Sequence, residues 1–240
     1  MKIAFIQKQS LIEYPGKISA IIFLAGCNLR CQFCYVPHLV LPEEIKKIKP
    51  ISKKEVFSFL KERKGFLEAV AISGGEPTLN EDLPDFIKEI KKIGYWVELE
   101  TNGTNFEMVK KLVEEKLIDY IAMDIKHKLE FEKWYEITGR VLTKELFENI
   151  KKTIHFVLEG KIDYQFRTTL IKEFHQKEDI IEICKTISGA KLYYLQNFEA
   201  TETGTISGKS FTPFSDEEIK EIIEAGKKYT NIKFRGYLSE

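Results

Sequence analysis

Residues 18–34 read Ile-Ser-Ala-Ile-Ile-Phe-Leu-Ala-Gly-Cys-Asn-Leu-Arg-Cys-Gln-Phe-Cys, an apolar run that leads directly into three cysteines. The apolar run predicts a buried β-strand over Ile18–Phe23. Cys27, Cys31 and Cys34 then fall within eight residues. Three thiolates at this spacing can hold an iron–sulfur cluster and leave one iron without a protein ligand. An iron with an open position is a place for chemistry.

Short β-rich runs alternate with amphipathic helical patterns along the rest of the chain. Strands are predicted at Ile18–Phe23, Ala69–Ile72, Trp96–Leu99, Tyr120–Met123, Tyr164–Leu170 and Lys191–Leu195, with Ile232–Tyr237 as a candidate last strand. Capping boxes mark helix starts between them, at Ser52 with Glu55, Thr104 with Glu107, and Ser215 with Glu218. Because strands joined by helical crossovers run parallel, we predict an α/β fold, a partial parallel (βα)6 TIM-like barrel.

Length and composition restrict the class of protein. The chain has 240 residues, is 43% hydrophobic and has no Pro-, Gly- or Ser-rich linker, so we expect one domain over residues 1–240. Lys+Arg and Asp+Glu are equal at 37 each, so no global charge attracts nucleic acid or anionic lipid. No segment approaches ~18 uninterrupted apolar residues, and the N-terminus lacks a signal peptide pattern. We expect a cytoplasmic protein without a nucleic-acid or membrane partner.

Polar residues lie at the ends of six predicted strands, which form the working face of a parallel βα barrel. In chain order they are Ala25-Gly26-Cys27, Ser73-Gly74-Gly75-Glu76-Pro77, Glu100-Thr101-Asn102-Gly103, Asp124-Ile125-Lys126, Arg167-Thr168-Thr169 and Gln196-Asn197. Strand alternation also puts two polar stripes on single faces, Glu98, Glu100 and Asn102 on one strand and Gln165, Arg167 and Thr169 on another. We expect a polar cavity that binds a polar ligand. The alternative is that both stripes face solvent.

The longest predicted loop is Glu199–Pro213, which is polar and rich in Gly, Thr and Ser. Loops of that length often serve as functional lids or partner contacts. A plain surface loop fits the same composition.

Two other readings of the cysteines fit less well. A structural zinc site needs a fourth ligand, for which only His38 or the remote Cys184 is at hand. Ferredoxins use Cys-x4-Cys-x2-Cys or Cys-x2-Cys-x2-Cys together with a fourth cysteine, whereas this run is Cys-x3-Cys-x2-Cys. The spacing therefore disfavours both zinc and simple electron transfer.

The Cys-x3-Cys-x2-Cys run resembles the defining motif of the radical S-adenosylmethionine (SAM) superfamily. The resemblance implies a [4Fe–4S] cluster on Cys27, Cys31 and Cys34, whose fourth iron is chelated by the amino and carboxylate groups of SAM. Phe33 matches the aromatic position near the adenine. Gly74-Gly75-Glu76 resembles the Gly-Gly-Glu motif that holds the methionine ammonium, where glycines let the backbone approach the ligand.

Within that superfamily the chain is more similar to glycyl-radical enzyme activating enzymes. The lead-in Ser10–Ser19 resembles the anaerobic ribonucleotide reductase activating proteins, and Thr101-Asn102-Gly103 resembles a motif near the ribose. Asp124-x-Lys126 and Arg167 match positions near SAM and substrate, and Lys126 is also expected to act in catalysis. Tyr35 and Gln196 complete the set of expected SAM contacts. Two departures, Cys34-Tyr35-Val36-Pro37 in place of Cys-His-Asn and Glu100 in place of Asp, weaken the assignment of substrate.

The resemblance implies that SAM is cleaved reductively and that a 5′-deoxyadenosyl radical removes a hydrogen. For an activase the hydrogen sits on a glycine Cα of a partner protein, and the electron donor is of the flavodoxin or ferredoxin type. Extra cysteines for a second cluster are absent, so one cluster is expected. The alternatives are an enzyme acting on a small molecule or RNA base, such as 7-carboxy-7-deazaguanine synthase, and a non-enzymatic iron–sulfur or zinc protein.

Overall fold

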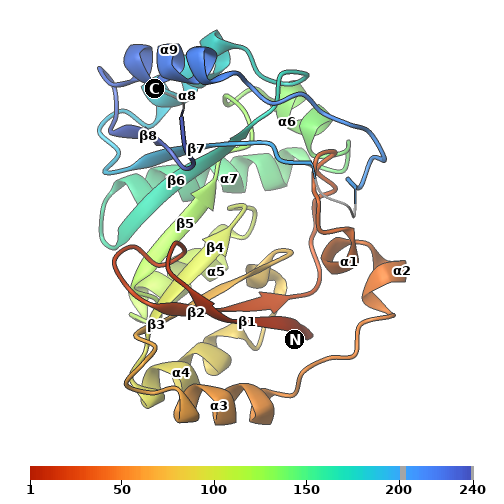
Figure 1. The fold of residues 1–240 in the computed structure, drawn as a ribbon, viewed down its shortest axis with the longest axis vertical. Helices are drawn as coiled ribbons and strands as arrows, with labels where there is room; N and C mark the ends of the chain where they lie inside the picture. The colour runs from red at the N-terminus through yellow and green to blue at the C-terminus, as the bar shows by residue number, and fades with distance from the viewer. Residues whose placement is uncertain (201–203, 239–240) are drawn as a thin grey trace.

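The computed structural model describes residues 1–200 and 204–238, and these form one mixed α/β fold around a single eight-stranded sheet (Figure 1). The strands lie in sequence order across the sheet. They are β1 (Ile3–Ser10), β2 (Ser19–Leu24), β3 (Ala69–Gly74), β4 (Trp96–Thr101), β5 (Tyr120–Asp124), β6 (Asp163–Leu170), β7 (Tyr193–Asn197) and β8 (Ile232–Phe234). All pairs from β2 to β8 are parallel, which confirms the predicted partial parallel barrel.

The first strand, β1, was not predicted from the sequence. It pairs with β2 in the antiparallel direction, and six of its eight residues are exposed or only partly buried before its end at Ser10. Its sequence, Ile-Ala-Phe-Ile-Gln-Lys-Gln-Ser, does not alternate between apolar and polar residues over its whole length. An edge strand with so little burial leaves a weak signal, because its stability comes from the pairing itself.

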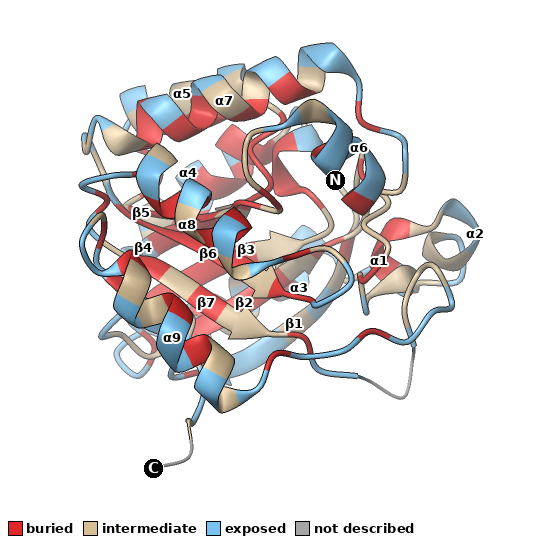
Figure 2. Ribbon diagram, turned by 90° about the horizontal axis from the view of Figure 1, so that it is seen from above, coloured by how far each residue is buried: buried red, intermediate tan, exposed pale blue. Residues whose placement is uncertain are grey.

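Helices connect the parallel strands and cover the outside of the sheet (Figure 1). They are α1 (Pro37–Val40), α2 (Pro42–Ile45), α3 (Lys53–Glu62), α4 (Leu83–Ile93), α5 (Phe106–Glu114), α6 (Phe131–Ile137), α7 (Lys144–Leu158), α8 (Lys177–Thr186) and α9 (Asp216–Gly226), with the 3₁₀ turn η1 (Pro77–Leu79) after β3. Figure 2 shows the buried strands at the centre and the exposed residues on the outer helix faces. In α4 the buried side chains Leu83, Phe86, Ile87 and Ile90 recur at helical spacing, so one face packs on the core.

Two of the three predicted capping boxes are confirmed, and one is wrong. The side chains of Ser52 and Ser215 each accept a hydrogen bond from the backbone N–H of the glutamate three residues later. The side chain of that glutamate accepts one from the backbone N–H of the serine. Helix α5 instead begins after Asn105, whose side chain accepts from Met108 N. The hydroxyl of Thr104 is used elsewhere, because it donates to Asn102 Oδ1 at 2.6 Å.

The barrel is open between β1 and β8, which do not pair. The loop between β1 and β2 spans part of this opening. Arg235, just after β8, donates to Ile12 O at 3.0 Å and pairs with Glu13 at 3.0 Å. Glu13 also lies 3.7 Å from Arg167 on β6, so the loop brings a carboxylate into the barrel interior.

Residues 204–213 of the predicted long loop lie against the cysteine loop, although most of their side chains are exposed (Figure 1). Ile206 N donates to Cys34 O at 2.9 Å, and Ser207 N donates to Gln32 O at 3.3 Å. Residues 201–203 of that predicted loop lie outside the described residues. The segment therefore packs along one side of the cysteine loop.

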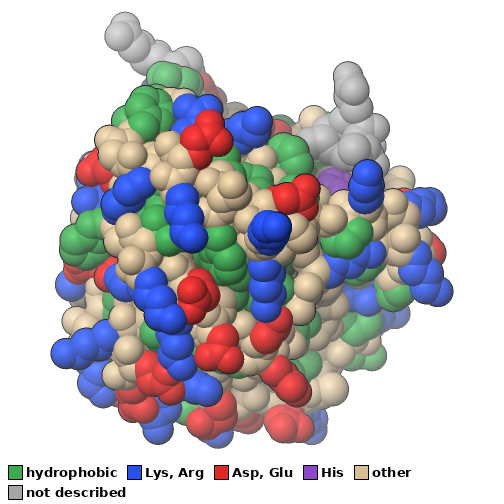
Figure 3. All heavy atoms as spheres, turned by 90° about the horizontal axis from the view of Figure 1, so that it is seen from below, with side chains coloured by type: hydrophobic (Ala, Val, Ile, Leu, Met, Phe, Trp, Pro, Cys, Tyr) green, Lys and Arg blue, Asp and Glu red, His purple; other side chains and the backbone are tan. Residues whose placement is uncertain are grey.

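The surface carries charges of both signs. On the face seen in Figure 3, Lys and Arg side chains are interspersed with Asp and Glu side chains. Within residues 1–200 and 204–238, no helix has both the length and the apolar composition needed to cross a membrane.

Candidate active site

The cysteine loop begins where β2 ends and is anchored by backbone hydrogen bonds to three other segments. These segments are α1, the C-terminal end of α6, and the segment before α9. The bonds are Gly26 N to Leu39 O (2.7 Å), Arg30 N to Thr138 O (3.1 Å), Gln32 N to Ile137 O (3.0 Å) and Ile206 N to Cys34 O (2.9 Å). An anchored loop can hold three side chains at fixed separations without help from a regular helix or strand.

Gly74 and Gly75 bring the end of β3 against the start of the cysteine loop. Gly75 N donates to Leu24 O at 2.8 Å, and Glu76 N donates to Gly26 O at 2.7 Å. A Cβ on Gly75 would lie 2.0 Å from Gly26 O, and one on Gly74 would lie 2.2 Å from Leu24 O. The close approach that requires glycine here is therefore to the protein's own backbone, whereas the sequence analysis attributed it to a ligand.

Glu76 is fully buried, and its carboxylate organises the turn after β4. It accepts hydrogen bonds from Thr101 Oγ1 at 2.8 Å and Asn102 N at 2.7 Å, and from the backbone and hydroxyl of Thr78. Burial raises the pKa of Glu76, and these donors oppose the rise. Oε1 accepts three of these bonds and Oε2 accepts one, so the carboxylate fixes Thr101 and Asn102 in place.

Asn102 reaches from β4 to the first cysteine. Its Nδ2 lies 3.9 Å from Cys27 Sγ and 3.2 Å from Asn28 Oδ1. Asn28 in turn donates to Thr104 Oγ1 at 2.9 Å. A polar network therefore connects the Thr101-Asn102-Gly103 segment to the cysteine loop, two segments that are 75 residues apart at their contact.

A chain of alternating charges runs across the barrel interior. Lys126 Nζ lies 2.8 Å from Asp124, and Asp124 lies 3.1 Å from Arg167 Nε. Arg167 also contacts Glu100 at 3.1 Å, and Glu100 accepts from Ser73 Oγ at 2.6 Å. The two predicted polar stripes thus face each other inside the barrel, which confirms that they do not face solvent.

The pKa values of these groups follow from their partners. Burial opposes ionisation of Asp124, but Lys126 and Arg167 lower its pKa below the usual value. Burial also opposes the charge on Lys126, but Asp124 and the nearby Cys31 raise its pKa above the usual value. Both groups are therefore charged at neutral pH, and Lys126 presents a positive charge toward the cysteine loop.

Lys126 contacts Phe33, which was expected at the site, and His175, which was not. Its Nζ lies 5.8 Å from the ring centre of Phe33, which packs in a small apolar cluster with Ile137, Ile171, Phe198 and Phe211. Its carbonyl oxygen accepts from His175 Nε2 at 2.8 Å, while His175 Nδ1 accepts from Ile171 N at 3.2 Å. Burial lowers the pKa of His175 to about 4, so the ring is neutral. No motif in the sequence indicated that His175, in the loop before α8, would contact Lys126.

A second polar group lies deeper in the barrel. Carboxylate oxygens of Glu13, Glu98 and Glu100 all lie within 4.8 Å of one another. No described residue donates to either oxygen of Glu98, which is fully buried. Burial and the neighbouring Glu100 hold the pKa of Glu98 well above its usual range. Burial therefore favours the neutral form of the Glu98 carboxyl over its ionised form. The sequence placed Glu98 on the polar stripe but gave no reason to bring Glu13 there.

Tyr35 and Gln196, both expected SAM contacts, lie at the edge of the site. Gln196 Nε2 donates to Thr169 Oγ1 at 2.9 Å, across the β6–β7 pair. Burial of the Tyr35 hydroxyl and the charge of Glu100 raise the pKa of Tyr35, although 52% of the residue is exposed. Both side chains are near enough to the interior to line an opening at the strand ends.

The cysteines suit a multi-iron cluster better than a single ion. Three sulfurs on one tetrahedral zinc lie roughly 3.8 Å apart, since each is about 2.3 Å from the metal. Among the described residues, the only group of three potential ligands with all atoms within 4.8 Å is the Glu13, Glu98 and Glu100 group, not the cysteines. A cluster separates its sulfur ligands because each binds a different iron. Cys184 is buried in α8, so it is not a fourth ligand of this loop.

The free thiols are protonated until a metal binds. Burial raises the pKa of Cys27 to about 12 and of Cys31 to about 11. Iron binds thiolates, so cluster assembly here releases protons. The buried positive charge of Lys126 partly offsets the cost of holding thiolates in this environment, because it lowers the pKa of both cysteines.

Comparisons with known proteins agree with this geometry. A sequence model of the Radical SAM superfamily matches residues 21–187. A Methanocaldococcus jannaschii protein is 34% identical over 225 residues, 92% of this chain and 89% of its own length, and its name reads "Putative glycyl-radical enzyme activating enzyme". The 7-carboxy-7-deazaguanine synthase of Aquifex aeolicus is 30% identical over 72% of this chain and 81% of its own length.

Among solved structures, that of Streptococcus suis SuiB bound to S-adenosylmethionine superposes with a TM-score of 0.67. The match covers 90% of this chain and 52% of SuiB at 18% identity, so it supports the fold alone. The family implies an iron–sulfur cluster and SAM, and the cysteine loop has the ligands for the cluster. The sequence match over most of the chain and the geometry of the loop lead to one conclusion: the chain belongs to the Radical SAM superfamily.

Proposed function

We propose that this protein is a glycyl-radical enzyme activating enzyme, which uses one [4Fe–4S] cluster and SAM to remove a hydrogen atom from a glycine of a partner enzyme. The observation that carries the proposal is the 34% identity to the M. jannaschii relative, which extends over nearly the full length of both chains. The GTP 3′,8-cyclase of Aquifex aeolicus matches a similar share of this chain, 91%, but only 67% of its own length. The partner is of the anaerobic ribonucleotide reductase or pyruvate formate-lyase type.

Cys27, Cys31 and Cys34 are proposed to hold the cluster and to leave one iron for SAM. When bound, the cluster supplies one electron to SAM, which splits into methionine and a carbon-centred radical that takes the hydrogen of the substrate. The protein's part is to orient the two reactants and to exclude water. The anchored cysteine loop and the buried charges next to it serve both purposes.

The remaining residues are proposed to hold SAM around that iron. We assign the backbone at Gly74 and Gly75 to the methionine group and Asn102, which Glu76 orients, to the ribose. Lys126, Asp124 and Arg167 supply opposite charges within hydrogen-bond reach of one another, and a zwitterionic amino acid can join such a chain through charge-assisted bonds. Phe33, Tyr35, Thr101 and Gln196 then line the adenosine side.

A second candidate function is a radical SAM enzyme acting on a small molecule, similar to 7-carboxy-7-deazaguanine synthase. The observation in its favour is the 30% identity to the A. aeolicus enzyme. The buried Glu13, Glu98 and Glu100 group could also bind a polar small molecule in the barrel. The match covers 72% of this chain, less than the 92% of the first relative, so we rank it second.

The test combines cluster assembly with product analysis. After anaerobic reconstitution and reduction, the wild-type protein should release 5′-deoxyadenosine from SAM. Cys31→Ala should lose both the cluster absorbance and this product, whereas Cys184→Ala, which removes the cysteine outside the loop, should keep both. Retention of cleavage by Cys31→Ala would overturn the radical SAM assignment of the loop.

The partner is tested separately. Incubation with SAM and an anaerobic ribonucleotide reductase or pyruvate formate-lyase from the same organism should give the paramagnetic resonance signal of a glycyl radical. Substitution of the radical-bearing glycine of the partner should abolish it. Cleavage of SAM that is stimulated by a small-molecule substrate, with no radical on any partner, would favour the second candidate.

A further inference from the structure

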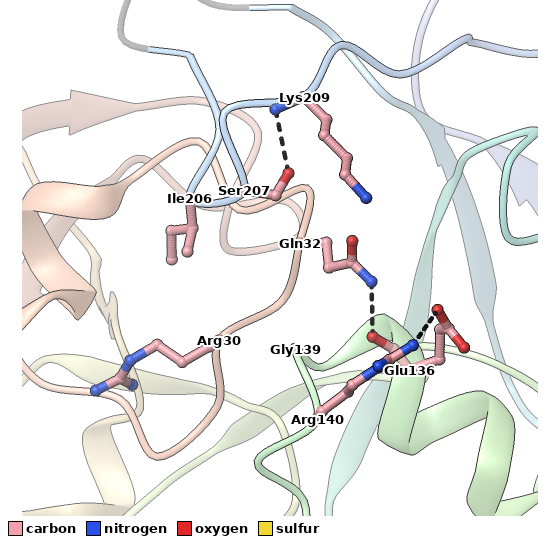
Figure 4. Close-up of a pocket in the computed structure, with 8 residues that line it drawn as sticks. All are labelled: Arg30, Gln32, Glu136, Gly139, Arg140, Ile206, Ser207 and Lys209. Carbon is pink, nitrogen blue, oxygen red and sulfur yellow. Dashed lines mark hydrogen bonds and ion pairs between the residues drawn. The ribbon is translucent and has the colours of Figure 1, made fainter.

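A cavity of about 490 Å³ lies beside the cysteine loop and outside the barrel interior (Figure 4). Its walls come from three segments, namely the cysteine loop, the C-terminal end of α6 and the segment before α9. The lining residues are Arg30, Gln32, Glu136, Gly139, Arg140, Ile206, Ser207 and Lys209. None of the interior charges at Asp124, Lys126 or Arg167 is among them, so this cavity is distinct from the proposed SAM site.

The wall of the cavity is the same backbone that carries the cysteines. Gln32 lies between Cys31 and Cys34, and its carbonyl accepts from Ser207 N at 3.3 Å. The Arg30 guanidinium donates to Cys27 O at 2.7 Å and to Leu29 O at 2.8 Å. A group that occupies the cavity therefore contacts the backbone segment that carries Cys31 and Cys34.

The cavity is positively charged although the chain as a whole is neutral. Arg30, Arg140 and Lys209 line it, against one carboxylate, Glu136. Glu136 is 3.5 Å from Arg140, and both side chains are more than half exposed, so water screens this pair strongly. Within residues 1–200 and 204–238, no carboxylate lies within 4.0 Å of the charged nitrogens of Arg30 or Lys209. Arg140 and Lys209 are exposed to solvent, whereas Arg30 is partly buried against the cysteine loop.

Backbone geometry holds these charges in place. Gly139 lies so close to the cysteine loop that a Cβ there would be 2.2 Å from Arg30 O. Arg140, the next residue, has a φ of 61°, which is uncommon for a residue with a side chain. Gln32 Nε2 donates to Glu136 O at 2.9 Å. These contacts fix the C-terminal end of α6, and with it the backbone of Arg140, beside the cysteine loop.

We propose that this cavity is the docking site of an acidic one-electron donor protein, with carboxylates around its own redox group. Charge complementarity selects such a partner and speeds its encounter. One electron leaves the reduced donor and enters the cluster through the outer face of the cysteine loop, while SAM and the hydrogen-donating substrate occupy the barrel side. The inference depends on the radical SAM chemistry and not on which molecule loses the hydrogen.

The test compares two reductants on one pair of charge-reversal variants. Arg140→Glu with Lys209→Glu changes two exposed side chains that lie outside the proposed SAM site. The matched control, Lys152→Glu with Lys228→Glu, makes the same change in net charge on exposed residues of α7 and the segment after α9. The rate of 5′-deoxyadenosine formation is measured with photoreduced 5-deazariboflavin, a small neutral reductant, and with a reduced acidic flavodoxin at limiting concentration.

With flavodoxin, the cavity variant should lose about tenfold or more in rate at low salt, within the range that electrostatic steering provides. With deazariboflavin its rate should stay within about twofold of wild type, and the control should match wild type with both reductants. A milder variant, Glu136→Gln, removes the only carboxylate of the cavity and should raise the flavodoxin-driven rate.

Three outcomes would overturn the inference. A cavity variant that keeps its flavodoxin-driven rate shows that the donor binds elsewhere. Equal loss with both reductants shows that the cavity serves the substrate or the fold and not the donor. Equal loss in the control shows a response to net charge alone. Absence of product from wild type with either reductant would refute the proposed function itself, which keeps the two failures apart.

Discussion

Replacement of Gly75 by alanine should separate β3 from the cysteine loop, because the new Cβ has no room. The Cβ would lie 2.0 Å from Gly26 O and 2.5 Å from Gly26 C, whereas contacts under 3.0 Å essentially never occur. The two backbones must move apart by about 1 Å, since neither atom belongs to a flexible side chain. The backbone of Gly75 is not in the left-handed region, so the effect is steric and not conformational.

The magnitude follows from what this movement breaks. Two hydrogen bonds, Gly75 N to Leu24 O and Glu76 N to Gly26 O, are lost or lengthened at about 1 kcal/mol each. Overpacking against backbone adds about 1–3 kcal/mol. The free energy of unfolding should therefore fall by about 3–5 kcal/mol, a drop of roughly 10 °C in Tm for a chain of this size.

The assay is urea unfolding followed by circular dichroism, together with the iron content after anaerobic reconstitution. Cys27 follows Gly26 directly, so Gly75→Ala should also reduce the iron bound per chain. Gly65→Ala is the control, because a Cβ there meets nothing within 4 Å and its φ of 96° tests only backbone strain. That strain should cost about 1–2 kcal/mol and leave the iron content unchanged. If Gly75→Ala matched Gly65→Ala in both measurements, the steric argument would be refuted.

Three further perturbations test the charges of the interior. Glu98→Gln should be more stable than wild type at pH 8 and as stable as wild type near pH 4. The pKa of Glu98 is higher in the folded chain, so above pH 4.5 the unfolded chain releases a proton that the folded chain keeps, and the wild type loses stability as the pH rises. Urea unfolding at both pH values checks this, and a less stable variant at pH 8 contradicts it. Between pH 6.5 and 4 the free energy of unfolding of His175→Gln should fall less than that of wild type. Folding lowers the pKa of His175 to about 4, so the wild type loses roughly 3 kcal/mol over this interval. Parallel pH–stability curves would refute this. Arg167→Met should lower the free energy of unfolding by about 3–5 kcal/mol, because Glu100 and Asp124 then stay buried without their common partner. The control Arg140→Met, on the surface, should lower it by less than about 0.5 kcal/mol. Equal losses in thermal unfolding would contradict the ion-pair chain.

Much of the fold could be predicted from local patterns. Six parallel strands began within two residues of their predicted starts, because buried runs such as Ile18–Phe23 and Tyr120–Met123 are apolar and short. The antiparallel β1 and the N-cap of α5 were missed or misplaced. Both depend on neighbours, since β1 is stabilised by pairing with β2, and the hydroxyl of Thr104 is taken by Asn102 and not by its own helix. Local propensity carries no information about such competition.

The candidate site divides in the same way. The spacing of Cys27, Cys31 and Cys34, the Gly-Gly-Glu run and the polar stripes could be read directly, because each is a feature of consecutive residues or of strand alternation. The sequence motif predicted a ligand contact for Glu76, and the structure adds that its carboxylate also accepts from Thr78, Thr101 and Asn102. A residue type shows which bonds a side chain can make but not which partner reaches it first.

The sequence by itself determined the family, the cysteine motif and the positions of most strands, since all of these are encoded in local patterns. Only the tertiary structure decided that Glu13 enters the barrel beside Glu98, that His175 supports Lys126, and that residues 206–209 meet α6 across the cysteine loop. These contacts join residues from 49 to more than 80 positions apart. The physical reason is that closure of a curled sheet sets their proximity, and closure is a property of the whole chain.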